Sequence, residues 1–127
     1  MGKKTVEKRC KYPAIETKKK TGNEQFLNAG SDVCTLRDFW VWAYSDLIGN
    51  TERGRLAEFI VAMALGITEG ISVSCDKYDL LSKEGIRVEV KTSAYLQSWS
   101  QQNLSKISFG IQPTYGWDNI TNEYDTE

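Results

Sequence analysis

Apolar residues recur at helical spacing between residues 36 and 47, on one stripe made of Leu36, Phe39, Trp40, Ala43, Tyr44 and Leu47. The residues around this stripe predict where the helix begins and ends. The Thr35 hydroxyl can cap the first turn, and Asp38, three residues on, completes a capping box. Gly49 is expected to end this helix.

A second helix is predicted from Asn50 or Thr51 to Leu65, with Gly66 as its C-terminal cap. Its later part is apolar all the way round except at Glu58, which is typical of a helix buried on several sides. An unpaired buried carboxylate costs several kcal/mol or more, so Glu58 needs a partner. Two partners are open: an arginine at the solvent edge of the helix, or a metal ion.

After Gly70 the apolar positions change to a period of two, which indicates strands. We expect one strand at 71–75 and a hairpin of two more, at 78–81 and 86–92, joined by a turn. A further strand is expected at 107–111, where Ile, Phe and Ile alternate with Ser and Gly. Two helices with several strands predict an α/β fold of the α+β kind.

Charged residues share one face of the strand predicted at 86–92. Alternation places Arg87, Glu89 and Lys91 opposite the apolar residues, and Asp79 lies across the hairpin. Like charges on Asp79 and Glu89 repel unless a cation lies between them. Two carboxylates and a lysine can hold a divalent metal and stabilise charge on a phosphate. The alternative is a surface ion-pair ladder, worth about 1 kcal/mol or less.

The amino-acid composition excludes several classes of protein and of catalytic site. The 127 residues are 40% hydrophobic and 26% charged, as in an ordinary soluble domain. Without histidine, a zinc site and a Ser-His or Cys-His nucleophile are essentially excluded. The three cysteines (Cys10, Cys34 and Cys75) have no disulfide-framework spacing, and no apolar run suggests a signal peptide or a membrane span. We therefore expect a cytoplasmic protein that does not bind membranes.

Positive charge is concentrated at the start of the chain. Residues 1–22 carry eight Lys or Arg against two Glu, while the rest of the chain is acidic on balance. We expect residues 1–33 to form a basic arm or tail and residues 34–127 to form the core domain. The arm has two readings, a solvated tail or a segment that lies along nucleic-acid phosphates, and both can hold at once.

Three stretches, in the order helix, strand, strand, together resemble a known family. They are Arg53-Gly-Arg-Leu-Ala-Glu58 with Ala62 to Gly66, Asp76-Lys-Tyr-Asp79-Leu, and Val88-Glu-Val-Lys-Thr-Ser93. Over roughly residues 35–111 the chain resembles the PD-(D/E)XK phosphodiesterase superfamily, the restriction-endonuclease-like fold that includes archaeal Holliday-junction resolvases. Two departures stand out: Tyr78 replaces the proline of the motif, and residues 112–127 offer no alternation for a further strand. The sheet is therefore expected to be incomplete at its C-terminal end.

The resemblance implies a mixed sheet flanked by helices and a Mg²⁺ (or Mn²⁺) site. Asp79 and Glu89 would be metal ligands together with the carbonyl of Val90, and Glu58 would be an additional carboxylate. Lys91 would orient the attacking water and stabilise charge on the scissile phosphate.

Three more residues are candidates for contact with nucleic acid. Gln97 matches a polar residue that several members place near the site, while Arg53 and Arg55, in the first turn of the second helix, could contact phosphates or be solvated. The function expected is a Mg²⁺-dependent DNA endonuclease, dimeric if it cuts both strands. The alternatives are a binding module that has lost catalysis and an α+β domain of unrelated function.

Overall fold

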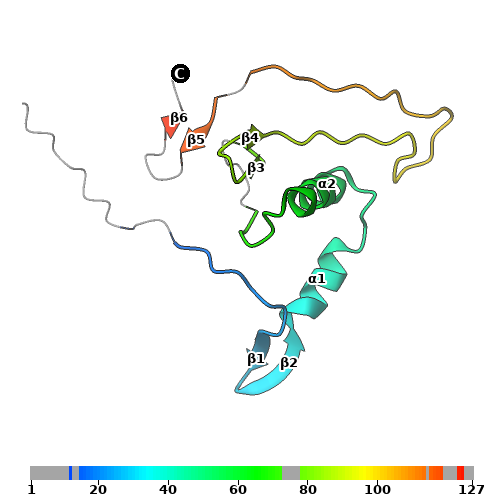
Figure 1. Cartoon of the computed structure of the whole chain (residues 1–127). Coiled ribbons are helices and arrows are strands. Elements are labelled where there is room, and N and C mark those ends of the chain that lie inside the picture. Colours follow the sequence, from blue (N-terminus) through cyan, green and yellow to red (C-terminus); the bar gives the residue numbers. More distant parts are fainter. Residues whose placement is uncertain (1–11, 13–14, 73–77, 114, 119–122, 125–127) are drawn as a thin grey trace, which may run out of the picture.

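The regular elements of the described part of the chain are two helices and three short hairpins, joined by long irregular segments (Figure 1). The computed structural model describes residues 12, 15–72, 78–113, 115–118 and 123–124. The elements in chain order are β1 (Gln25–Asn28), β2 (Ser31–Thr35), α1 (Leu36–Tyr44), α2 (Asn50–Leu65), β3 (Leu80–Leu81), β4 (Arg87–Val88), β5 (Trp117–Asp118) and β6 (Glu123–Tyr124). This combination is an α+β fold, as predicted.

Every sheet among the described residues has two antiparallel strands: β1 with β2, β3 with β4, and β5 with β6. The expected mixed sheet is not formed there. The strand predicted at 107–111 is also wrong, because those residues are described and belong to no strand. Alternation of apolar and polar residues makes a segment suitable for a strand, but a strand forms only when another segment pairs with it. Here Ile111 is 88% exposed and belongs to no sheet. The strand predicted at 71–75 falls largely outside the described residues.

The hairpin β1–β2 was not predicted. Its turn is Ala29-Gly30, and both residues have positive φ (51° and 84°), as a two-residue hairpin turn requires. The pairing shifts register between Phe26 and Leu27, which breaks the alternation that would have marked a strand. The hairpin lies mostly within the segment expected to be an arm, and the division of the chain at residue 33 stays a prediction.

Both helices form largely where their capping residues predicted them. Thr35 caps α1: its hydroxyl accepts from the backbone N–H of Asp38 (3.3 Å), and its own N–H donates to Asp38 Oδ2 (2.7 Å). The helix ends at Tyr44, earlier than expected, so Leu47 lies in the connector. Gly66 ends α2 in the left-handed conformation (φ 63°), with its N–H directed to the carbonyls of Ala62 and Met63.

The apolar faces of the helices are largely uncovered. Ala62 on α2 is the buried hydrophobic residue of the described part, whereas Phe59, Ile60 and Met63 are each more than half exposed. The prediction that α2 is buried on several sides is therefore wrong. Neither described helix is both long and apolar enough to cross a membrane.

One long-range contact joins the start of the chain to the end of α2. The Lys19 ammonium donates to the carbonyl oxygens of Thr68 (2.7 Å) and Glu69 (3.3 Å). Lys19 is thereby attached to the turn that follows α2, whereas Gly22 and Glu24 accept from the N–H groups of Arg37 and Leu36 at the start of α1.

Candidate functional site

The hairpin β3–β4 carries the residues to which sequence analysis assigned chemistry. Leu80 pairs with Val88 and Leu81 with Arg87. The turn closes through the N–H of Ser82, which donates to the Ile86 carbonyl (2.9 Å), and Gly85 has φ 81°. The hairpin is confirmed but shorter than predicted, since β4 stops at Val88. Glu89 and Lys91 therefore lie just beyond the paired strand.

Glu89 and Lys91 form an ion pair at this end of the hairpin. The Lys91 ammonium lies 2.6 Å from Glu89 Oε1, and both side chains are about half exposed. The hydrogen bond to Glu89 raises the pKa of Lys91 above its usual 10.5, and the negative charges of Glu89 and Asp79 add to this effect. Lys91 is therefore a permanent cation at neutral pH.

Asp79 is held beside the same segment by a backbone contact. The N–H of Val90 donates to Asp79 Oδ2 at 2.6 Å. The contact spans the hairpin, so the Asp79 carboxylate lies next to the residue between Glu89 and Lys91. Asp79 therefore lies beside Glu89 and Lys91 along the chain path, as the predicted hairpin requires. The contact that shows this joins the Asp79 side chain to the backbone of Val90.

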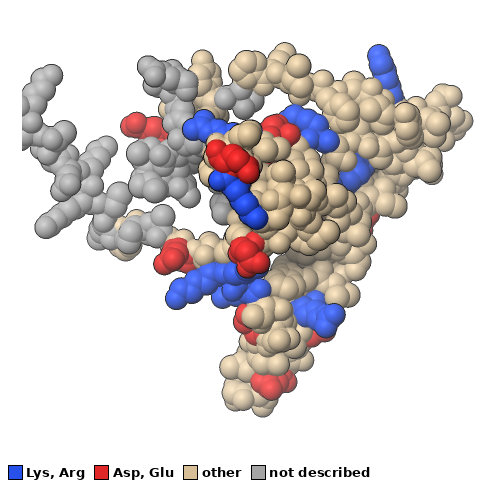
Figure 2. Space-filling view, in the orientation of Figure 1, with Lys and Arg blue, Asp and Glu red and all other residues tan. Residues whose placement is uncertain are grey.

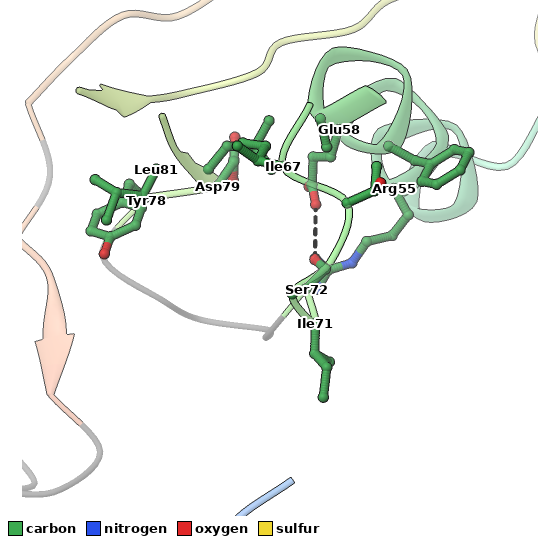
Figure 3. A pocket seen from close by; sticks show the side chains of 13 residues that line it. Arg55, Glu58, Ile67, Ile71, Ser72, Tyr78, Asp79 and Leu81 are labelled. Atoms are coloured by element: carbon green, nitrogen blue, oxygen red, sulfur yellow. Dashed lines mark hydrogen bonds and ion pairs between the residues drawn. The ribbon is translucent and has the colours of Figure 1, made fainter. Parts of the chain in front are cut away.

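Glu58 lies in a polar cluster with Arg55 and Ser72 (Figure 3). Arg55 Nη1 lies 2.9 Å from Glu58 Oε2 and also donates to the Ser72 hydroxyl, which in turn donates to Glu58 (3.2 Å). The Glu58 side chain is only 15% exposed. Of the two partners that the sequence left open for Glu58, the arginine is therefore present.

Glu58 and Asp79 line one pocket of about 310 Å³, between α2 and β3. Apolar residues, among them Ile67 and Ile71, form much of its wall (Figure 3). Glu89 and Lys91 instead line a separate depression of about 360 Å³, whose other wall is residues 110–113. Asp79 lines the first pocket and also binds the N–H of Val90, which lies between the two residues that line the depression.

The predicted metal ligands are thus brought together only in part. Among the described residues, no three Cys, His, Asp or Glu side chains converge in a way that could hold a metal ion. Asp79 and Glu89 each use one carboxylate oxygen in the contacts above and keep a second one. Carboxylate and carbonyl oxygens are ligands that Mg²⁺ and Mn²⁺ prefer, so the chemistry of Asp79, Glu89 and the Val90 carbonyl fits such an ion.

Arg53 and Gln97, both predicted near nucleic acid, contact each other. Arg53 Nη1 donates to Gln97 Oε1 at 3.4 Å and to the Ile48 carbonyl at 2.8 Å, and Nη2 donates to Asn50 Oδ1 at 2.6 Å. Ser72, in the cluster around Glu58, was not singled out from the sequence, and neither was Gln101, whose side chain accepts from the Gln97 N–H (2.8 Å). Neither belongs to a motif, so no sequence signal could have found them.

Acidic and basic side chains lie close to one another on the face of the molecule drawn in Figure 2, rather than in one basic patch. The basic residues 1–11 lie outside the described part, so the structure does not test their role as a nucleic-acid arm.

The comparisons with known proteins give the family. The model of the family described as Bacteriophage T4 endonuclease IV matches residues 41–125, which include the end of α1, all of α2 and the whole β3–β4 hairpin. No curated protein and no solved structure matches the chain. Since the match spans well over half of the sequence, this chain belongs to the Bacteriophage T4 endonuclease IV family, and its class is that of a DNA endonuclease.

Proposed function

We propose that the chain hydrolyses DNA phosphodiesters by a Mg²⁺-dependent mechanism of the PD-(D/E)XK type, with Asp79, Glu89 and Lys91 as its central residues. The observation that carries the proposal is the cluster at the end of the hairpin, where the Val90 N–H holds Asp79 beside the Glu89–Lys91 pair. Membership of an endonuclease family supports the same chemistry.

Asp79, Glu89 and the carbonyl of Val90 would hold the metal. Bound there, Mg²⁺ or Mn²⁺ would lower the pKa of a water molecule and shield the negative charge of the phosphate. Glu58, across the adjoining pocket, is the additional carboxylate of the proposal, and Arg55 and Ser72 fix its orientation.

Lys91 acts as a fixed positive charge. Because its pKa is raised above 10.5, it holds its proton at neutral pH and is a poor acceptor for the proton of the attacking water. Its ammonium instead stabilises the negative charge that grows on the phosphate in the transition state. The depression between Lys91 and residues 110–113 is the place where the DNA backbone would lie.

The test is cleavage of plasmid and linear DNA with and without Mg²⁺ or Mn²⁺. We expect cleavage only with the metal, and a fall of about tenfold or more in Lys91→Ala, because one preorganised charge in the transition state is worth this much. Thermal unfolding of Lys91→Ala should be little changed, since exposed ion pairs contribute about 1 kcal/mol or less.

Lys106→Ala is the matched control, because Lys106 is exposed and lies outside the site. Undiminished cleavage in Lys91→Ala would assign the chemistry to another part of the chain. DNA binding without cleavage, weakening as salt rises, would instead identify a binding module that has lost catalysis.

A further inference from the structure

Glu89 and Lys91, which are proposed to act on DNA, lie on a segment of backbone that is not part of a β-sheet. β4 ends at Val88, and among the described contacts one bond, from the Val90 N–H to Asp79, ties the segment that carries Glu89 and Lys91. What fixes the other end of this segment decides where the Lys91 ammonium lies.

That other end runs into a loop, residues 94–105, with its own hydrogen-bond network. Gln97 Nε2 donates to the Ala94 carbonyl (2.9 Å) and to the Ser105 hydroxyl (3.2 Å). The backbone N–H of Gln97 donates to Gln101 Oε1 (2.8 Å), and the N–H of Ser105 donates to the Tyr95 carbonyl (2.9 Å). Gln97 is therefore the centre of the loop, and its first anchor, Ala94, comes three residues after Lys91.

Arg53 connects this loop to the body of the protein. Its guanidinium binds the Ile48 carbonyl before α2, Asn50 at the start of α2, and the free carboxamide oxygen of Gln97. The Nε atom of Arg53 is buried and has no hydrogen-bond partner in the described part of the chain. A guanidinium whose two terminal nitrogens both donate to acceptors of the protein itself is badly placed to bind a phosphate.

We propose that Arg53 is a positioning residue: through Gln97 it holds the 94–105 loop against the start of α2, and this contact fixes the position of Lys91. The inference rests on the proposed function for its effect on cleavage. It replaces the expectation that Arg53 and Gln97 contact DNA directly.

Two measurements on the full chain test the loop itself without any nuclease assay. Hydrogen exchange of the amides at 94–105 should become faster in Arg53→Ala, because the loop loses its anchor. NMR of the Lys91 ammonium should show a changed environment in the same variant. Arg37→Ala, which removes an exposed arginine from α1, is the control and should change neither signal.

Kinetics separate a positioning role from a phosphate contact. We expect kcat of Arg53→Ala to fall about tenfold or more, since small displacements of a catalytic group can cost up to about 100-fold, while KM for DNA stays within about twofold. The double variant Arg53→Ala with Gln97→Ala should lose about as much as Gln97→Ala alone, because Gln97→Ala already removes the contact through which Arg53 acts, together with its own bonds to Ala94 and Ser105. Arg53→Lys should restore little, because an ammonium cannot serve three acceptors in the fork geometry of Arg53.

Unchanged exchange at 94–105 in Arg53→Ala would overturn the proposal whatever the nuclease activity. So would a loss confined to KM with a salt slope smaller by about one, which is the signature of a lost phosphate contact. If Arg53→Ala does not fold, Arg53→Lys makes the same tests, because it keeps the aliphatic part of the side chain but not the fork geometry that joins Gln97 to Ile48 and Asn50. If the wild-type chain does not cleave DNA, the proposed function fails, while exchange and NMR still decide the role of Arg53.

Discussion

At the scale of single residues, the charge state of Lys91 is the property that most constrains the proposed mechanism. Its pKa is raised mainly by the hydrogen bond to Glu89. A folded-state pKa above the unfolded one means that the ammonium stabilises the fold fully below pH 10.5 and that this contribution is lost as pH rises through the higher folded value. The charge is therefore complete over the whole physiological range.

Replacing Glu89 by Gln should lower the pKa of Lys91 towards its usual value. The variant removes the negative charge and the charge-assisted hydrogen bond, while Asp79 still acts from a distance. NMR titration of the Lys91 ammonium measures the shift, and Glu84→Gln, in the hairpin turn, is the control. An unaltered Lys91 pKa in Glu89→Gln would mean that the ion pair is not formed in solution.

The sequence predicted these residue contacts unevenly. Alternation placed Glu89 and Lys91 on one face, since residues two apart on extended backbone must point the same way. The choice of Arg55 and Ser72 as partners of Glu58 could not be settled, because Ser72 is distant in the chain and belongs to no motif. Arg53 and Gln97 were singled out as candidates for contact with nucleic acid, but their mutual contact depends on how a loop folds back on a helix.

At the scale of elements, α1 depends on its first turn. Thr35→Ala removes the hydroxyl that accepts from Asp38 N–H and should destabilise the protein by about 1 kcal/mol. Urea unfolding of Thr35→Ala beside Thr51→Ala, an exposed position in the first turn of α2, measures the difference. Equal stabilities of the two variants would show that the capping box adds nothing.

The same capping box gives α1 a defined acid sensitivity. Bonds from the Thr35 backbone and hydroxyl lower the pKa of Asp38 below 3.8. The stabilisation is therefore present above pH 3.8 and is lost as pH falls through the lower folded value. In Thr35→Ala this loss should begin at a higher pH, since fewer bonds hold the carboxylate ionised.

Helices were more predictable than strands for a physical reason. The cap at Thr35 and the left-handed Gly66 are set by residues within one turn, so local sequence is sufficient. A strand exists only when another segment pairs with it, and the alternation at 107–111 carries no information about that partner. The β1–β2 hairpin was missed because its bulge hides the alternation.

At the scale of the whole molecule, the α+β class was predictable from the order of the elements, but the amount of uncovered surface was not. Many large apolar side chains of the described residues are more than half exposed, among them Ile15, Val33 and Trp99. Much apolar area, including Trp42 at 83% exposure, is therefore left for contact with other molecules.

We predict that the protein forms homodimers, because many large apolar side chains of the described part are uncovered and stable dimers bury apolar area of this kind. Sedimentation velocity over a range of micromolar concentrations should show a dimer that dissociates on dilution. A single species with the mass of one chain at every concentration would contradict the prediction.

The bond from Lys19 to the Thr68 carbonyl has a consequence for the order of folding. It closes a loop of 49 residues. Joining the ends of a free chain of that length costs about 3.5 kcal/mol in entropy, more than the roughly 0.5–1.5 kcal/mol that one hydrogen bond returns. The start of the chain can therefore attach only after the two helices have shortened the path between its ends, so it is among the last segments to settle and the first to detach.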